Sequence, residues 1–193
     1  LEDAREKMAW EVAAELLAAQ EVDLIHLAGT PPFMMLGCDG ERALVDKWQE
    51  RFGIPVSAAP MSDVAVLRAL GVTRLVGVTY SELQNELSRD YMIEAGFDVL
   101  AMEPIIVPFS EAGRISSRQV YSHIRETFLA HPDADGIYIQ GNAWRVLDII
   151  EMVERDFGVP VAHASCTLSW EVQKHLHIHS PRDGFGRLLR ELP

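Results

Sequence analysis

Short apolar runs alternate with longer amphipathic segments along the 193-residue chain. The apolar runs predict strands at 23–28, 54–58, 74–79, 97–101, 136–140 and 159–163. Apolar residues at helical spacing predict helices over 2–20, 40–52, 62–70, 81–95, 117–130, 143–156 and 167–178. Short strands separated by helices are typical of βαβ units and parallel sheets, so the pattern predicts an α/β protein.

An internal repeat organises these elements. The segment DLIHLAGT at 23–30 matches DGIYIQGN at 135–142, an offset of 112 (141 minus 29). A helix and a second strand follow each copy, with ERFGIPV at 50–56 matching ERDFGVPV at 154–161, an offset of 105 (158 minus 53). The second match has an alternative explanation, because a glycine that ends a helix and a proline that opens a strand are common in α/β proteins. Two matches in the same order favour a molecule with a pseudo-twofold axis.

Such a repeat predicts two pseudo-symmetric lobes, each a mainly parallel sheet flanked by helices, with a cleft between them. We expect lobe 1 to hold about 1–60 plus 165–193, and lobe 2 about 61–164, within one unit. Ligands of parallel sheets bind beyond the carboxyl ends of the strands, which places the turns after Gly29 and Gly141 at the cleft. Leu1 opens within a helical pattern, so we expect that an N-terminal strand is missing from this sequence.

The composition of the chain limits the kinds of partner that it is expected to bind. The net charge of −12 repels nucleic-acid phosphate and anionic lipid, so neither nucleic acid nor a membrane is an expected partner. We found no membrane-spanning run and no signal-peptide pattern, and two cysteines do not make a disulfide framework. The expected location is the cytoplasm. Any anion site must be a local construction, such as backbone N–H groups at a helix start.

Several motifs together resemble a known family. They are AGTPPFMMLG at 28–37, LRALGVTRLVGVTYSELQNE at 67–86, DADGIYIQGNAWRVLDIIEMVERDFGVPV at 133–161, and Trp170 soon after the last strand. They cover nearly the whole chain, which resembles the maleate isomerase and arylmalonate decarboxylase group of the aspartate/glutamate racemase superfamily. The resemblance implies a two-lobed enzyme without a cofactor, which moves a proton at the carbon beside a carboxylate. By analogy, it also implies a homo-oligomer.

The chain departs from this family at its catalytic positions. In the two-cysteine members, cysteines stand at the positions of Gly29 and Gly141, and the decarboxylase-like pattern keeps the second of them. Glycine has no group that donates a proton, so the usual thiol mechanism cannot run from either position. Another proton carrier is therefore required.

The anion-holding residues of the family match better. Thr30 matches the first-loop donor, whereas Pro31 replaces a serine and lacks an N–H. Tyr80 matches the strand-end tyrosine that binds the substrate carboxylate, although a buried interface tyrosine is the alternative. Asn142 offers an amide donor, and it also suits the N-cap of the helix predicted at 143–156.

Three other residues carry reactive groups. Cys166, just beyond the last strand, is a candidate displaced thiol or simply a small buried residue. His163, three residues earlier, is a candidate acid–base or a strand-end histidine without a role. Cys38 stands at a predicted helix start, where the dipole lowers a thiol pKa, but ordinary packing is the simpler explanation. The repeat does not pair the two cysteines, and His175, His177 and His179 do not form a convincing metal site.

These observations predict a cofactor-independent isomerase or racemase, or a decarboxylase-like lyase, acting on a small carboxylic acid through a stabilised enediolate. The candidate proton carriers are Tyr80, Cys166, His163 or a group on the missing N-terminal segment. The substrate-binding candidates are Gly29, Thr30, Pro31, Tyr80, Gly141 and Asn142, with no metal and no cofactor. A catalytically silent carboxylate-binding protein of the same family is the alternative. A generic doubly wound binding domain would be preferred if Gly29 and Gly141 did not share a cleft.

Overall fold

The structure, a computed structural model, describes residues 2–193, with side chains described from Ala9 onward; Leu1 lies outside the described residues. The strands are β1 (Ile25–Leu27), β2 (Val56–Ala58), β3 (Arg74–Thr79), β4 (Asp98–Pro104), β5 (Gly136–Ile139) and β6 (Val161–His163). The helices are α1 (Glu2–Ala18), α2 (Thr30–Met34), α3 (Gly37–Phe52), α4 (Ala59–Ala69), α5 (Glu82–Glu94), α6 (Ser117–Ala130), α7 (Ile150–Phe157), α8 (Ala164–His175) and α9 (Arg187–Glu191), with a 3-10 helix η1 (Phe109–Arg114). All six predicted strands are present.

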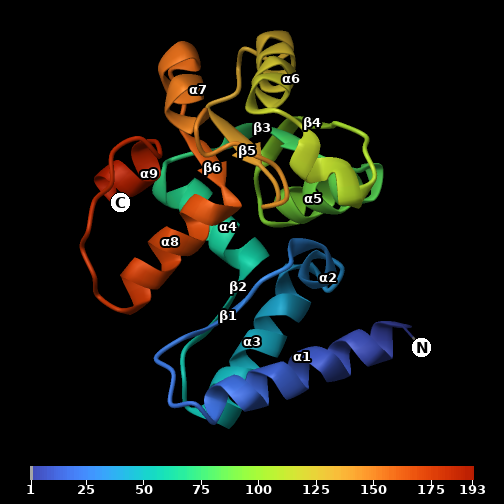
Figure 1. Ribbon diagram of the computed structural model, residues 1–193, viewed down its shortest axis with the longest axis vertical. Coiled ribbons are helices and arrows are strands. Elements are labelled where there is room, and N and C mark those ends of the chain that lie inside the picture. The colour runs from blue at the N-terminus through green and yellow to red at the C-terminus, as the bar shows by residue number, and fades with distance from the viewer. Residues whose placement is uncertain (1) are drawn as a thin grey trace.

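The strands form two parallel sheets, which confirms the predicted α/β class. β1 pairs with β2 in a two-stranded sheet, and the other four have the order β4-β3-β5-β6. Figure 1 shows the smaller sheet with α1 and α3 at one end of the molecule and the larger sheet at the other. Helices α4 and α8 lie between the two ends, whereas α6 and α7 cover the outer side of the larger sheet.

The strand registers reproduce the sequence repeat. Ile25 is the partner of Val56 in the small sheet, and Ile137 is the partner of Val161 in the large one. These pairs are related by the two sequence offsets, 112 (137 minus 25) and 105 (161 minus 56). The repeat is therefore a structural duplication of a strand pair, and it is more than a shared turn pattern.

Helix-end side chains repeat as well. The side-chain oxygen of Gln49 accepts from the Val56 N–H at 3.1 Å, and Glu154 accepts from the Val161 N–H at 2.9 Å. Each clamps the start of a strand to the end of the preceding helix. The second strand of each pair then runs directly into a helix, α4 after β2 and α8 after β6, and these two helices pack together. The repeated units thus meet through α4 and α8.

Two apolar cores correspond to the two sheets. The smaller contains Ile25, Leu27, Phe33, Trp48 and Val56, from the N-terminal elements. The larger surrounds β3 and β5, and it also takes in four residues of the C-terminal segment, namely Cys166, Trp170, Leu188 and Leu189. Residues 165–193 therefore pack with the second core, not with lobe 1 as expected, because α8 and α9 cover β6.

The largest difference between the predicted and the observed secondary structure lies just after Gly141. A helix was predicted over 143–156, but α7 begins only at Ile150, after an irregular segment. Trp144, Val146 and Ile149 are buried in the large core from that segment, so tertiary packing overrides their helical spacing. The short helices α2, η1 and α9 were not predicted. Helix α2 starts with Thr30-Pro31-Pro32, and its prolines suit a first turn although they look like a loop in sequence.

None of the described helices combines the length and the apolar character that a membrane crossing requires.

Candidate active site at the strand ends

The larger sheet has a topological switch point. Strand β3 lies between β4 and β5, so the chain leaves β3 on one side and returns on the other. The carboxyl ends of β3 and β5 stay adjacent, because Val78 pairs with Ile139 and the Gln140 N–H donates to the Val78 carbonyl at 3.0 Å. Ligands of open α/β sheets bind at such a point. The residues that follow there are Tyr80 and Gly141.

Tyr80 and Gly141 touch across this switch point. A Cβ built on Gly141 would lie 2.4 Å from the Tyr80 hydroxyl oxygen and 2.4 Å from its Cε1, so the phenol occupies the space of a residue-141 side chain. Gly141 also has φ of +90°, a conformation that residues with a side chain rarely adopt. The absence of a side chain at residue 141 is what lets the phenol reach the strand end.

The Tyr80 ring is held by two other aromatic rings. Trp144 meets it edge-on at 5.2 Å and 84°, and Phe109 of η1 lies 6.0 Å away. The Tyr80 side chain is only 5% exposed, and this burial raises its pKa. The phenol therefore stays protonated at neutral pH, and it can donate a hydrogen bond or a proton.

Sequence reasoning missed Trp144 and Phe109. Trp144 comes three residues after the strand-end Gly141, and this closeness in sequence could have indicated it. It was instead assigned to the helix predicted over 143–156. Phe109 lies in a segment without periodicity, and only the fold brings it to Tyr80.

Three of the six buried side-chain polar atoms without a partner in the described structure belong to residues close in sequence to Tyr80 or Gly141. Gln84 Oε1, Gln140 Oε1 and Trp144 Nε1 have no hydrogen-bond partner within the described part of the chain. Such atoms are uncommon in folded proteins and call for an explanation. Each belongs to a residue within four positions of Tyr80 or Gly141, which is consistent with a ligand site.

His163 is in direct contact with the strand end, although it lacks the properties of a free acid–base. Its Nε2 donates to the Gly141 carbonyl at 3.1 Å, and its Nδ1 accepts from the Ser165 N–H at 3.3 Å, where it caps α8. This pairing requires the neutral ring with its proton on Nε2. Burial lowers the pKa of His163 to about 4. The contacts make His163 a positioning residue for the Gly141 turn.

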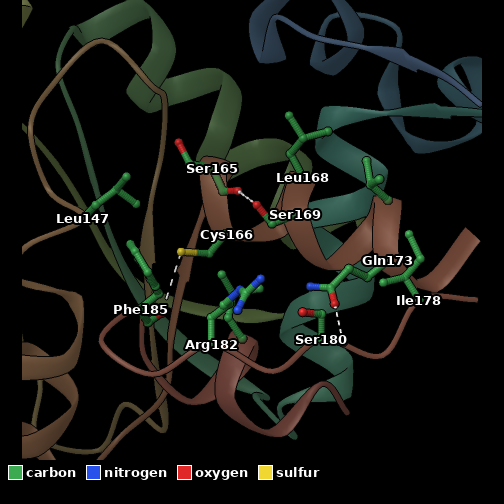
Figure 2. Close-up of a pocket in the computed structure, with 12 residues that line it drawn as sticks. Leu147, Ser165, Cys166, Leu168, Ser169, Gln173, Ile178, Ser180, Arg182 and Phe185 are labelled. Atoms are coloured by element: carbon green, nitrogen blue, oxygen red, sulfur yellow. Dashed lines mark hydrogen bonds between the residues drawn. The ribbon is translucent and has the colours of Figure 1, made fainter. Parts of the chain in front are cut away.

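Cys166 faces another part of the molecule. Its thiol is directed at the Phe185 carbonyl, 3.7 Å away, and it lines a cavity to which neither Tyr80 nor Gly141 contributes (Figure 2). Burial raises the pKa of this thiol to about 12, so it is not a thiolate at neutral pH. The geometry counts against Cys166 as the proton carrier at the strand end.

Cys38 packs against the larger core, as the simpler explanation predicted, and it is not an activated thiol. Burial and the nearby Glu94 carboxylate raise the pKa of the Cys38 thiol, whereas its place in the first turn of α3 predicted a lowered value. Its thiol is 3.8 Å from the Tyr91 carbonyl, and its N–H donates to Glu94 at 2.9 Å. Both cysteines are free.

Asn142 lies on the exposed side of the turn. It does not cap α7, which starts eight residues later; instead its Oδ1 accepts from the Ser165 hydroxyl at 2.8 Å. This bond joins the turn after β5 to the start of α8, so Asn142 and His163 fix the same turn from two sides.

The first strand-end turn has a similar backbone in a different setting. Gly29 has φ of +99°, and a Cβ built there would meet no atom within 4 Å. Thr30, 5% exposed, and Pro31 then open α2, which packs on α5, the helix that starts just after Tyr80. In Figure 1, α2 lies on the side of the small sheet that faces the larger lobe. The structure thus brings the Thr30 turn to the junction of the lobes.

Among the side chains that the structure describes, from Ala9 onward, no cluster of three or more His, Cys, Asp or Glu residues suited to a metal ion occurs.

Comparison with known proteins gives a consistent result. The family model described as arylmalonate decarboxylase matches residues 6–189. The arylmalonate decarboxylase of Bordetella bronchiseptica is 29% identical over 181 residues, which cover 92% of this chain and 75% of that protein.

Two solved structures are similar along most of the chain. A crystal structure of arylmalonate decarboxylase is 28% identical with a TM-score of 0.85, covering 92% of this chain and 79% of that one. The maleate isomerase Iso from Pseudomonas putida S16 has a TM-score of 0.90 at 22% identity, covering 100% of this chain and 80% of that one, a likeness of fold. The resemblance stated from sequence motifs is confirmed, and the chain belongs to the arylmalonate decarboxylase family.

Proposed function

We propose that this protein is a cofactor-independent enzyme that decarboxylates a small malonate-type acid through an enediolate, with Tyr80 as the proton donor. The family and its relatives support an isomerase or decarboxylase of small carboxylic acids. The finer assignment depends on one observation, the Tyr80 phenol in the space where a side chain of residue 141 would stand.

The proposed chemistry needs one proton. The bond between the α-carbon and one carboxylate breaks, CO2 leaves, and the electron pair stays on the remaining carboxylate as an enediolate. The Tyr80 O–H then gives its proton to the α-carbon, and the product is a monocarboxylate. Because burial raises the pKa of Tyr80, the tyrosinate that forms takes a proton back from water readily.

Racemisation is harder to support. It requires one group to remove a proton and a second group to add one on the opposite face. Both strand-end glycines lack such a group, and the Gly29 turn borders open space. A single phenol suits decarboxylation, which needs protonation from one side only.

The anion would be held by neutral donors. Thr30 supplies a hydroxyl from the first turn, and the backbone N–H groups at Gly141 and Asn142 come from the second. The side-chain oxygen Oδ1 of Asn142 already accepts from the Ser165 hydroxyl, so the side-chain NH2 group of Asn142 is left for a ligand. Preorganised donors of this kind stabilise developing negative charge in a water-poor site. Gly29 and Pro31 would shape the turn without supplying side-chain donors.

The aromatic surroundings favour a substrate with an aryl or other apolar substituent. Phe109 is 70% exposed beside Tyr80, and Trp144 packs on the same ring. An exposed aromatic ring next to a candidate site offers apolar contact area to a substituent on the α-carbon.

The reaction is tested with Tyr80→Phe and phenylmalonate, following CO2 release and deuterium uptake from D2O into phenylacetate. Loss of the proton donor should lower kcat by about 100-fold or more, with a smaller effect on KM. Tyr121→Phe is the matched control, because Tyr121 lies on α6 and donates to Asp156 at 2.8 Å. That variant should keep full turnover.

Two results would contradict the proposal. Unchanged turnover in Tyr80→Phe would remove Tyr80 as donor. Binding of phenylmalonate without CO2 release or deuterium uptake by the unmodified protein would favour the alternative, a silent carboxylate-binding member of the family.

A further inference from the structure

A cavity lies on the C-terminal side of the larger lobe, and neither Tyr80 nor Gly141 lines it. It has a volume of about 610 Å³ and is bounded by α8, the segment from Ile178 to Phe185 and α9 (Figure 2). That volume falls within the range of small-molecule sites.

The walls of this cavity are mainly apolar. Their apolar side chains are Leu147, Leu168, Val172, Ile178, Phe185 and Leu189. Three of them keep considerable exposure, with Leu147 at 39%, Ile178 at 48% and Phe185 at 38%. An apolar group of a ligand would remove this surface from water, which favours binding.

One charge faces this apolar surface. The Arg182 backbone N–H donates to the Leu189 carbonyl at 2.8 Å, which ties the segment to α9, and its guanidinium points into the cavity in Figure 2. No acidic residue lines the cavity, and Arg182 has no salt-bridge partner among the residues that the structure describes. An unpaired cation in a chain of net charge −12 is a local attraction for an anion.

Neutral donors stand beside that cation. The Gln173 side-chain oxygen Oε1 accepts from the Ser180 N–H at 2.8 Å. This bond turns the Gln173 NH2 group toward Arg182 in Figure 2. The Ser169 hydroxyl, which donates to the Ser165 carbonyl at 3.0 Å, also borders the cavity. A guanidinium with an adjacent amide is well suited to a carboxylate, which accepts several hydrogen bonds.

We propose that this cavity is a second ligand site, which binds an amphipathic monocarboxylate such as an arylacetic acid. The carboxylate would pair with Arg182 and Gln173, and the apolar body would lie against Leu168, Ile178 and Phe185. The inference does not depend on the proposed reaction, because it follows from the cavity alone.

The site is tested by calorimetric titration of the full chain with phenylacetate. Arg182→Gln should weaken binding at this site by about tenfold or more, the usual effect of losing a charged hydrogen-bonding partner. Arg118→Gln is the matched control, since Arg118 is an exposed arginine on α6 outside the cavity, and it should bind within about twofold of the parent. Phenylacetamide, which lacks the charge, should bind weakly to both parent and variant.

A second variant keeps the proposal falsifiable if Arg182→Gln loses stability. The isosteric variant Gln173→Glu keeps an acceptor for the Ser180 N–H and places a negative charge beside the ligand carboxylate, so calorimetric titration should show phenylacetate binding weakened by about tenfold or more.

Three results would overturn the second site. They are equal affinity in Arg182→Gln and the parent, binding that is lost in Tyr80→Phe but retained in Arg182→Gln, and absence of binding up to about 10 mM. Absence of CO2 release from phenylmalonate would contradict the proposed reaction and leave this site untouched.

Discussion

The two copies of the repeat share a backbone scaffold and differ at their strand ends. Both have a strand pair in the same register, a side-chain clamp from the preceding helix, and a strand-end glycine with positive φ. In the first copy, Gly29 borders open space, whereas in the second Gly141 is covered by Tyr80. The residue at the end of the second strand is Ala58 in one copy and His163 in the other, related by the offset of 105 (163 minus 58).

This difference shows that the repeat accounts for the backbone scaffold and does not account for the side chains at the strand ends. The shared hydrogen bonds hold two turns at the ends of equivalent strands. Within the described part of the chain, a phenol, a buried imidazole and an aromatic neighbour lie at the second turn, whereas a Cβ at Gly29 would meet no atom within 4 Å. A near-symmetric scaffold thus carries different groups at its two strand ends, which suits the proposed reaction with one proton donor.

The largest expected effect comes from adding a methyl group to each glycine in turn. Gly141→Ala combines left-handed strain with overlap on the Tyr80 ring, so the free energy of unfolding should fall by about 3 kcal/mol or more and turnover should be lost. Gly29→Ala carries the strain alone and should cost about 1 kcal/mol. Urea unfolding measures both.

Removal of the Tyr80 ring tests the cause of this asymmetry. In a Tyr80→Ala background, Gly141→Ala should cost no more than Gly29→Ala does in the parent. Equal costs of the two glycine substitutions in the parent chain would show that the Tyr80 contact has no steric consequence.

A smaller effect is expected from pH. The pKa of His163 falls from 6.5 to about 4 on folding, because the buried ring resists protonation. The unfolded chain then binds the proton first on acidification, so stability falls between pH 6.5 and 4, by up to about 3 kcal/mol. The counterpart Ala58 has no such dependence.

Asp63 of α4 produces the opposite slope. Burial raises its pKa from 3.8 to about 7, so the folded state holds a proton that the unfolded state has lost, and stability falls as pH rises through that window. Asp63→Asn should therefore reveal the His163 slope, and His163→Asn, which keeps a capping side chain, should reveal the Asp63 slope. Urea unfolding between about pH 4.5 and 7.5 measures both. Identical pH profiles in the parent and both variants would refute this assignment.

The smallest effect concerns the two helix-end clamps. Glu154 accepts from the backbone N–H groups of Val161 and Arg187, at 2.9 and 2.6 Å, whereas Gln49 accepts from Val56 alone among the residues that the structure describes. Glu154→Ala should cost about 2 kcal/mol and Gln49→Ala about 1 kcal/mol, measured by thermal and urea unfolding. Glu154→Gln keeps an acceptor and should stay closer to the parent. A larger cost for Gln49→Ala would show that the second clamp adds nothing through Arg187.

Local sequence was sufficient for the six strands, for most of the longer helices and for the strand ends. The six strands were predicted because apolar runs report which residues are buried in a sheet, and the repeat was visible because turns need particular residues at particular offsets. The motifs around Tyr80 and Gly141 located the candidate site for the same reason. Helix 143–156 was wrong in its first half because Trp144 packs on Tyr80, a contact across 64 residues (144 minus 80) that periodicity does not report.

The sequence by itself determined the α/β class, the duplicated strand pairs and the two glycine turns, because these depend on local patterns of apolar residues and on backbone conformations that favour glycine. Only the tertiary structure decided which group fills the space at residue 141, that His163 is buried in its neutral form, and that the C-terminal segment joins the second core. Those features depend on packing and on the loss of water around residues distant in the chain.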